Sequence, residues 1–300
     1  MKLVHLSDLH FPVALPFMTL KGKMIPGYMN YTFRRMRKYP ISLWDAIVRK
    51  VQSLDPEAII ISGDITNVSH HREYDEALRI LKPVLGDKTF MVPGNHDRYT
   101  RVAAGKKGTD LPYYEKFFSS WMGDSIPIQN GYLRIKKIGK LTLVGWDSNM
   151  PLSVLNAYGY VGEEIVHSTL EYLEKEKLDH YILICHHPIW NPPERQESSG
   201  HKMKNREEIA ELLKKRPPLA YLHGHVHTNW VKYPDPQKPY YVINSASSTR
   251  ISDQRHQSGF HLMEWNGKAL NVKRFSFSNE EGEFIETKTI SYQEKETNGR

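Results

Sequence analysis

Residues 88–97, with the sequence KTFMVPGNHD, decide the fold of this chain. The apolar half of the stretch predicts a short buried strand, which the Pro-Gly step ends. Asn95, His96 and Asp97 then place an amide, an imidazole and a carboxylate at three consecutive positions. A surface turn needs at most one such group. A site that holds a metal ion and also donates a proton can use all three.

Four more apolar runs end in residues of the same kind. The five groups of polar residues are Asp8 with His10, Asp64, Asn95 with His96, His186, and His225 with His227. Ligands gather at the carboxyl ends of strands in α/β sheets, so we expect these side chains to converge. A spacing of two residues on extended chain points both side chains the same way. Carboxylate, amide and imidazole donors without a thiolate suit Mn, Fe or Zn, and so many imidazoles disfavour Mg or Ca alone.

The 300 residues, 39% of them hydrophobic, are enough for one large domain. We expect a catalytic domain at 1–277 with an insertion at 11–41, followed by a polar extension at 278–300 that has at most one edge strand. Cys185 is the only cysteine and lies in an apolar run, which excludes an intramolecular disulfide and favours a reducing compartment. With no signal-peptide core or long apolar span, the sequence predicts a cytoplasmic protein.

Strand-like and helical stretches alternate along the front of the chain, which predicts α/β layers with a mixed sheet. The expected helices are 42–53, 71–82, 113–122, 163–177 and one opened by Asn205. The expected strands are 2–6, 57–62, 88–92, 131–137, 140–146, 180–185 and 219–222, with antiparallel strands after them. Capping boxes are expected at Ser42 with Asp45 and at Asn205 with Glu208.

The insertion after His10 carries much of the net charge of +7. Its six cations, with no acid between Asp8 and Asp45, are Lys21, Lys23, Arg34, Arg35, Arg37 and Lys38. If 28–38 is helical, Met29, Phe33 and Met36 share one face and Arg34, Arg35 and Lys38 another. The pattern suits a lid over the site, a segment lying on an anionic membrane, or an ordinary helix with a solvated basic face. Arg34, Arg35, Lys38 and His187 are the candidate substrate contacts.

The motifs together resemble a known family. They read Asp8-x-His10, Gly63-Asp64, Gly94-Asn95-His96-Asp97, His186-x-Pro188 and Gly224-His225-x-His227. This set is similar to the complete motif set of the calcineurin-like metallophosphoesterases, in particular the branch of class III cyclic nucleotide phosphodiesterases and bacterial phosphodiesterases. The resemblance spans residues 5–227 without a substituted ligand. It implies a four-layer α/β sandwich of two mixed β-sheets flanked by helices.

The resemblance also implies a dinuclear centre and a role for each residue. One metal would be held by Asp8, His10 and His227, the other by Asn95, His186 and His225, and Asp64 would bridge both. A metal-bridging hydroxide would attack phosphorus in line. His96 would assist the leaving group and Asp97 would orient His96.

The substrate class stays open among four readings. The first is a small phosphodiester or pyrophosphate. The second is a lipid-linked pyrophosphate or phospholipid, hydrolysed at the inner membrane surface by a peripheral enzyme. The third is nucleic acid, and the fourth is a non-catalytic scaffold, which degraded ligand positions would indicate; none is degraded here. Nothing in the sequence indicates an oligomeric state.

Overall fold

Two mixed β-sheets pack face to face in this computed structural model, which describes residues 1–105, 111–128, 131–253 and 256–292. The first sheet has the order β13 (Glu283–Thr287), β12 (Leu270–Ser278), β11 (Gly259–Trp265), β1 (Lys2–Leu6), β2 (Ala58–Ile61), β3 (Thr89–Met91). The second has the order β14 (Ser291–Tyr292), β9 (Asn229–Lys232), β10 (Tyr241–Ser245), β8 (Ala220–His223), β7 (Tyr181–Cys185), β6 (Leu141–Trp146), β5 (Gly131–Ile138), β4 (Asp124–Ile128).

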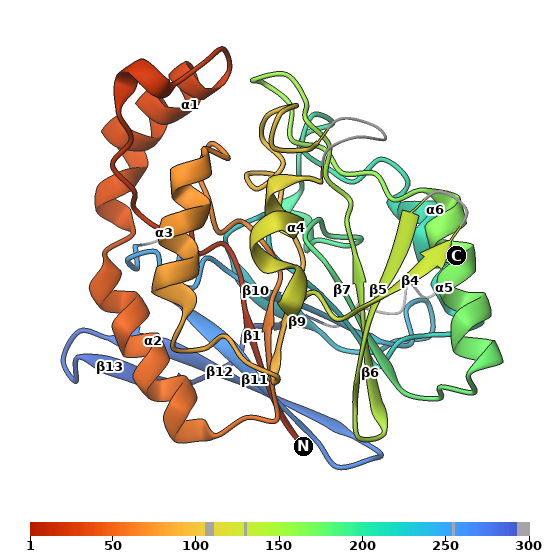
Figure 1. Cartoon of the computed structure of the whole chain (residues 1–300). Helices are drawn as coiled ribbons and strands as arrows, with labels where there is room; N and C mark the ends of the chain where they lie inside the picture. The colour runs from red at the N-terminus through yellow and green to blue at the C-terminus, as the bar shows by residue number, and fades with distance from the viewer. Residues whose placement is uncertain (106–110, 129–130, 254–255, 293–300) are drawn as a thin grey trace.

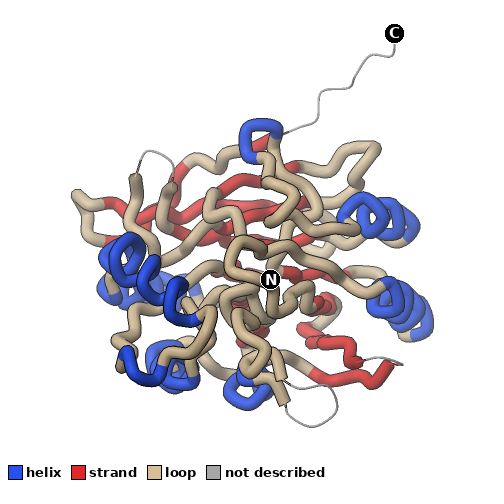
Figure 2. The backbone as a smooth tube through the Cα atoms, turned by 90° about the horizontal axis from the view of Figure 1, so that it is seen from above, coloured by secondary structure: helices blue, strands red, loops and turns tan. Residues whose placement is uncertain are grey.

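The alternation of side chains along the strands builds the layers. In β2, Ile60 packs between the sheets, whereas Ile59 and Ile61 face the helices. The helices on the first sheet are α2 (Ile41–Leu54), α3 (His71–Leu81) and α4 (Tyr113–Phe118). Those on the second are α5 (Glu163–Lys175) and α6 (Arg206–Lys215). Figure 2 shows helices on both sides of the strands, so the expected four-layer sandwich is confirmed.

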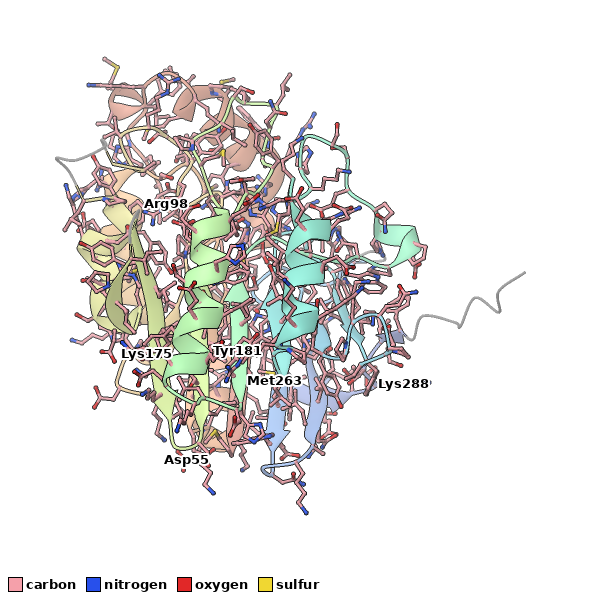
Figure 3. The ribbon with its side chains drawn as sticks, turned by 90° about the vertical axis from the view of Figure 1, so that its right-hand side faces the viewer. Asp55, Arg98, Lys175, Tyr181, Met263 and Lys288 are labelled. Atoms are coloured by element: carbon pink, nitrogen blue, oxygen red, sulfur yellow. The ribbon has the colours of Figure 1, made fainter. Side chains whose placement is uncertain are left out.

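The central strands of both sheets run parallel. β1 pairs with β2 and β2 with β3 in the first sheet, and β6, β7 and β8 follow the same pattern in the second. Their carboxyl ends therefore meet at one end of the molecule, at the top of Figure 1 and away from the N-terminus. Figure 3 gives the same orientation, with Arg98 near that end and Asp55 at the opposite one.

Most expected helices and strands are present, but both capping boxes are wrong. α2 begins after Pro40, whose side chain makes no capping bond. Because the helix begins at Ile41, Ser42 already lies inside its first turn and cannot act as the N-cap. Asn205 precedes α6, yet its side chain hydrogen-bonds the backbone of Val161 instead. The capping box that forms belongs to His70 and Glu73 at α3. The strand β4 was not expected.

Much of the insertion is helical, including residues 28–38, for which a helix was considered. It contains a short turn at Phe17–Thr19, α1 (Met24–Asn30), a π-helical turn at Tyr31–Arg35 and a 3₁₀ turn at Met36–Lys38. Tyr31 is buried, and Arg35 points inward instead of sharing an outer face with Arg34. The π turn explains this, because its wider hydrogen-bonding step shifts the helical phase after Tyr31. α1 lies at the top of Figure 1, above the carboxyl ends of the strands.

The expected polar extension begins at residue 278, and residues 293–300 of it lie outside the described part of the chain. Its described part supplies two edge strands in place of the one expected, β13 and β14, one at an edge of each sheet. Phe284 of β13 is fully buried in the core beneath α2. In the ranges described, no helix has the length and hydropathy needed to cross a membrane.

Candidate metal centre

The polar residues at the strand ends lie together, as their positions after parallel strands predict. We call seven of them the ligand cluster: Asp8, His10, Asp64, Asn95, His186, His225 and His227. Five have left-handed backbone, with φ of 50° at Asp8, 43° at His10, 56° at Asp64, 70° at His225 and 52° at His227. Non-glycine residues rarely adopt this conformation, and it concentrates at functional sites. The sharp turns aim consecutive polar side chains from each strand end into one space.

Two glycines make the close approach of these loops possible. A Cβ atom on Gly94 would collide with the backbone nitrogen and the carboxylate of Asp64. A Cβ atom on Gly224 would collide with Ser7 and with the carboxylate of Asp8. Glycine is therefore required at both positions by space, because the loops after β3 and β8 lie directly against the carboxylates.

The first group of donors comes from three loops, those that follow β1, β2 and β8. One ligand atom from each of Asp8, His10, Asp64 and His227 lies within 4.8 Å of the others. The Nε2 atom of His227 is 3.1 Å from Asp8 Oδ1, and the Nε2 atom of His10 is 3.6 Å from Asp64 Oδ2. Two carboxylates and two imidazoles in this space match the donors that divalent transition metals prefer.

A second group shares Asp64 with the first. His186 Nε2 lies 3.4 Å from Asp64 Oδ2 and 3.2 Å from Asn95 Oδ1. His225 Nδ1 lies 2.9 Å from the same Asn95 oxygen. The two groups therefore meet at the Asp64 carboxylate, which is the arrangement that two cations with a shared ligand require.

Backbone carbonyls fix the orientation of two imidazoles. Nδ1 of His186 faces the carbonyl of Ser62 at 2.8 Å, and Nδ1 of His10 faces the carbonyl of Thr66 at 3.1 Å. A carbonyl only accepts hydrogen bonds, so both Nδ1 atoms carry the proton and both Nε2 atoms face the centre. Such outer hydrogen bonds are typical of histidines that bind metals.

The electrostatics of the cluster favour positive charge. Burial alone would lower the pKa of His186, but the neighbouring Asp64 carboxylate raises it to about 10. Asp8 and Asp64 are both buried, and burying two carboxylates a few ångströms apart is costly without a cation nearby. The donor chemistry and this field fit bound divalent cations.

His96 sits at the edge of the cluster with its ring held on three sides. Nδ1 faces the carbonyl of Asn67 at 2.6 Å, and the ring stacks on Tyr99 with centroids 5.7 Å apart. The ring also contacts His10 edge-on at 5.0 Å. Burial lowers the pKa of His96 to about 4. Because Nδ1 donates to the Asn67 carbonyl, Nε2 is the atom of the neutral ring that can take up a proton.

Asp97 does not touch the imidazole of His96, contrary to the expectation that it orients this ring. Its carboxylate accepts hydrogen bonds from the backbone N–H groups of Ile65, Thr66 and Gly94 and from the Thr66 hydroxyl. Asp97 thus joins the loop after β2 to the loop after β3. The carbonyl of Asn67 is the group that orients His96.

A cavity of about 500 Å³ opens over the cluster. Arg35 and Lys38 line it, and Arg35 Nη2 lies 3.0 Å from His10 Nε2. Arg34 is exposed and lies outside the wall. His187 is buried, and its two ring nitrogens hydrogen-bond the Ser148 hydroxyl and the Ala157 carbonyl. The prediction that His187 contacts substrate is therefore wrong; its ring packs against that of His225.

Sequence reasoning missed several residues of the wall. They include Lys23, Tyr39, Asn67, Tyr99, His201 and Arg250. Tyr99 follows His96 by three positions, a spacing that places both rings on one side of a tight turn and was a usable signal. The others come from loops distant in sequence. His201 brings its carbonyl to 3.2 Å from His225 Nε2, and Glu197 lies 3.2 Å from the same atom.

The chain resembles several known proteins. A curated protein of Rhodococcus erythropolis, a probable cyclic nucleotide phosphodiesterase, is 25% identical over 235 residues. The match covers 75% of this chain and 64% of that protein, so the chain spans less than two thirds of this relative.

Two solved structures share the fold. A dimetal phosphatase from Danio rerio has a TM-score of 0.60 at 14% identity, over 91% of this chain and 95% of that one. A purple acid phosphatase from yellow lupin (Lupinus luteus) seeds has a TM-score of 0.57 at 13% identity, over 97% of this chain and 53% of that one. At these identities the likeness concerns the fold.

The family model described as calcineurin-like phosphoesterase matches residues 1–229. That range contains all seven residues of the ligand cluster and His96. The resemblance seen in the sequence motifs is therefore confirmed. The chain belongs to the calcineurin-like phosphoesterases, a family of metal-dependent phosphohydrolases.

Proposed function

We propose that this protein is a dinuclear metal-dependent phosphodiesterase acting on a small phosphodiester or pyrophosphate. One observation carries the proposal: two groups of metal donors share the Asp64 carboxylate directly beneath a cavity with a cationic wall. Because the Rhodococcus relative is a probable cyclic nucleotide phosphodiesterase, a cyclic nucleotide is the first substrate to try.

The ligand cluster would hold two transition-metal ions, Mn, Fe or Zn. Asp8, His10 and His227 would bind one ion, Asn95, His186 and His225 the other, and Asp64 both. Bound there, the ions would supply Lewis-acid chemistry, which withdraws charge from phosphoryl oxygens and lowers the pKa of water. The only cysteine, Cys185, is buried on the helix-facing side of β7, so no thiolate competes for the ions.

His96 would supply the proton for the leaving oxygen. Its Nδ1 atom is committed to the Asn67 carbonyl at 2.6 Å, so the exchangeable position is Nε2. In the buried neutral ring, Nε2 accepts a hydrogen bond. An anionic phosphate beside the ring raises the pKa of His96 and favours the protonated form. Substrate binding thereby prepares the acid that the departing oxygen needs.

The cavity wall favours an anionic substrate. Lys23, Arg35, Lys38 and Arg250 line it, and Asp64 is the one carboxylate among its described lining residues. Arg250 also pairs with Asp253 at 2.7 Å, outside the lining. Arg35 is the cation nearest to the ligand cluster, because its guanidinium lies 3.0 Å from His10. It is the residue we expect to bind a phosphoryl oxygen that the ions do not.

Elemental analysis and an activity panel test the proposal. Protein reconstituted with Mn should hold about two ions per chain and hydrolyse phosphodiesters faster than phosphomonoesters. Asp64→Ala should lose bound metal and nearly all activity, whereas Asp45→Ala, an exposed control on α2, should keep both. At most one ion in fully active protein would refute the dinuclear centre. Metal binding without hydrolysis across the panel would indicate a scaffold.

A further inference from the structure

Two segments that line the cavity, the insertion and the loop at 150–157, also carry exposed apolar side chains. Met18 is 91% exposed and Phe33 is 80% exposed, and Phe17 and Met29 on the same insertion are also exposed. Across the cavity, Leu155 is 83% exposed beside Val154, which lines the wall. Large apolar side chains gathered at a functional opening mark an interaction surface more often than chance exposure does.

Cations are interleaved with these apolar side chains. Lys21, Arg34 and Arg37 are exposed, and among the described residues no carboxylate forms an ion pair with them. The chain has no acid between Asp8 and Asp45 that could neutralise them locally. We call the combined surface the rim; it consists of Phe17, Met18, Lys21, Met29, Phe33, Arg34, Arg37 and Leu155.

The rim is held as one firm surface around the opening. Lys23 Nζ donates hydrogen bonds to the carbonyl of Leu152 at 3.0 Å and to that of Tyr99 at 3.3 Å, which ties the insertion to both neighbouring loops. The carbonyl of Lys38 accepts a bond from the N–H of Ile251 at 2.8 Å. Beneath α1, Val13, Leu15, Leu20 and Val68 form a small core of their own. The backbone that carries the outer side chains is therefore anchored to the rest of the molecule.

We propose that the rim docks on an anionic lipid bilayer, so that the cavity opens onto the membrane surface and takes a phosphoester carried by a lipid. Apolar side chains enter the boundary of headgroups and acyl chains, while interleaved Lys and Arg bind acidic headgroups. The lipid part rests on the proposed phosphodiesterase function; the docking part does not.

Charge complementarity selects this partner over a second copy of the chain. A symmetric dimer through the rim would bring the same cations of two copies face to face, with no acid in the insertion to offset them. An anionic bilayer offers negative charge to the cations and hydrocarbon to Met18 and Phe33 at once. Nucleic acid would satisfy the charge but not the two large aliphatic side chains, Met18 and Leu155.

Flotation with lipid vesicles tests the docking. The full-length protein should bind vesicles containing about 30% phosphatidylglycerol and should bind pure phosphatidylcholine at least about tenfold more weakly. The triple change Lys21→Gln, Arg34→Gln, Arg37→Gln should weaken binding to the anionic vesicles at least about tenfold. The pair Met18→Ser, Phe33→Ser should weaken it at least about fivefold. None of these residues lines the cavity.

Matched controls use exposed residues elsewhere on the surface. Lys82→Gln, Lys175→Gln, Lys215→Gln removes the same charge, and Tyr132→Ser, Ile290→Ser removes two exposed apolar side chains. Both controls should bind vesicles like the unchanged protein. Every variant should hydrolyse bis(p-nitrophenyl) phosphate at the unchanged rate, which shows that the fold and site are intact.

The outcomes separate the two proposals. No preference for anionic vesicles, or equal losses in rim and control variants, would overturn docking even when the soluble ester is hydrolysed. If the rim triple variant lost DNA binding but bound vesicles normally, nucleic acid would replace the membrane as the partner of the rim. If the rim triple variant sedimented as a smaller species than the unchanged protein but bound vesicles normally, the rim would be a self-association surface. Vesicle binding without hydrolysis of any ester would uphold docking while the phosphodiesterase function fails.

Discussion

The ligand cluster and the rim are built by opposite rules. In the ligand cluster, buried charged and polar side chains sit on strained backbone, and backbone carbonyls fix two of the imidazoles. In the rim, exposed apolar side chains sit beside cations that make no ion pair within the described part of the chain. They lie on short α, π and 3₁₀ turns and on adjoining loops, partly above a small core. The difference teaches where each proposed property would reside: the strand ends would supply the chemistry, and the insertion would select what approaches it.

The largest effect is expected where the ligand cluster has no spare space. Gly94→Ala places a methyl group against the backbone and carboxylate of Asp64, the ligand that both proposed ions share. Since a misplacement of about 1 Å alone costs about a hundredfold, activity should fall at least about a thousandfold. Steady-state kinetics and metal analysis of the purified variant measure the loss.

Gly86→Ala is the matched control for this change. Gly86 has open space where the new methyl group would lie, so the variant should keep both activity and metal content. If Gly94→Ala were as active as Gly86→Ala, the close packing of the loop after β3 against Asp64 would not matter for chemistry. The ligand cluster would then tolerate an added methyl group as well as an exposed loop does, and the comparison with the rim would fail.

An intermediate effect is expected at His96, which lies between the ligand cluster and the cavity wall. His96→Ala should slow hydrolysis of a diester with a poor leaving group by about a hundredfold. The loss should shrink to less than about tenfold for a nitrophenyl leaving group, because an easily expelled oxyanion needs less protonation. A series of aryl phosphodiesters measures the trend, and the metal content should stay unchanged. Equal losses across the series would exclude the acid role.

The sequence predicted the ligand cluster well because its positions follow from strand ends. Each candidate ligand comes directly after a buried apolar run, and parallel strands bring those ends to one edge. The role of Asp97 was missed for a physical reason. Which group orients His96 depends on how the loop after β2 folds back, and a backbone carbonyl such as that of Asn67 leaves no trace in the residue pattern.

The rim was only partly predictable. Helical periodicity indicated an amphipathic segment at 28–38, and the structure is helical there. A regular helix would have put Arg34 and Arg35 on one outer face, but the π turn at Tyr31–Arg35 sends Arg35 to the ligand cluster. No local signal in the sequence marks such a turn, which begins at the buried residue Tyr31. The cationic wall formed by Lys23 and Arg250 likewise depends on tertiary contacts.

The smallest effect is expected at Lys23, where the insertion meets the cavity. Burial lowers the pKa of Lys23 from 10.5 to about 8. As pH rises from 7 to 9, its ammonium group loses a proton and with it the attraction for an anionic substrate. The KM for an anionic diester should therefore rise, by about two- to fivefold for one partly exposed charge. The kcat should follow other groups and need not change with it.

Lys23→Met tests this step, because it removes the ammonium group, which lies 3.7 Å from the centre of the Tyr99 ring, and keeps a side chain of similar length. At pH 7 its KM should already have the raised value, and the Lys23-dependent rise between pH 7 and 9 should disappear. Lys21→Met is the matched control, since Lys21 is exposed and does not line the cavity. The control should keep the rise of the unchanged protein. If Lys23→Met also kept the rise of KM between pH 7 and 9, the charge of Lys23 would not contribute to substrate binding. The view that the insertion selects the substrate while the ligand cluster performs the chemistry would then lose its support at Lys23.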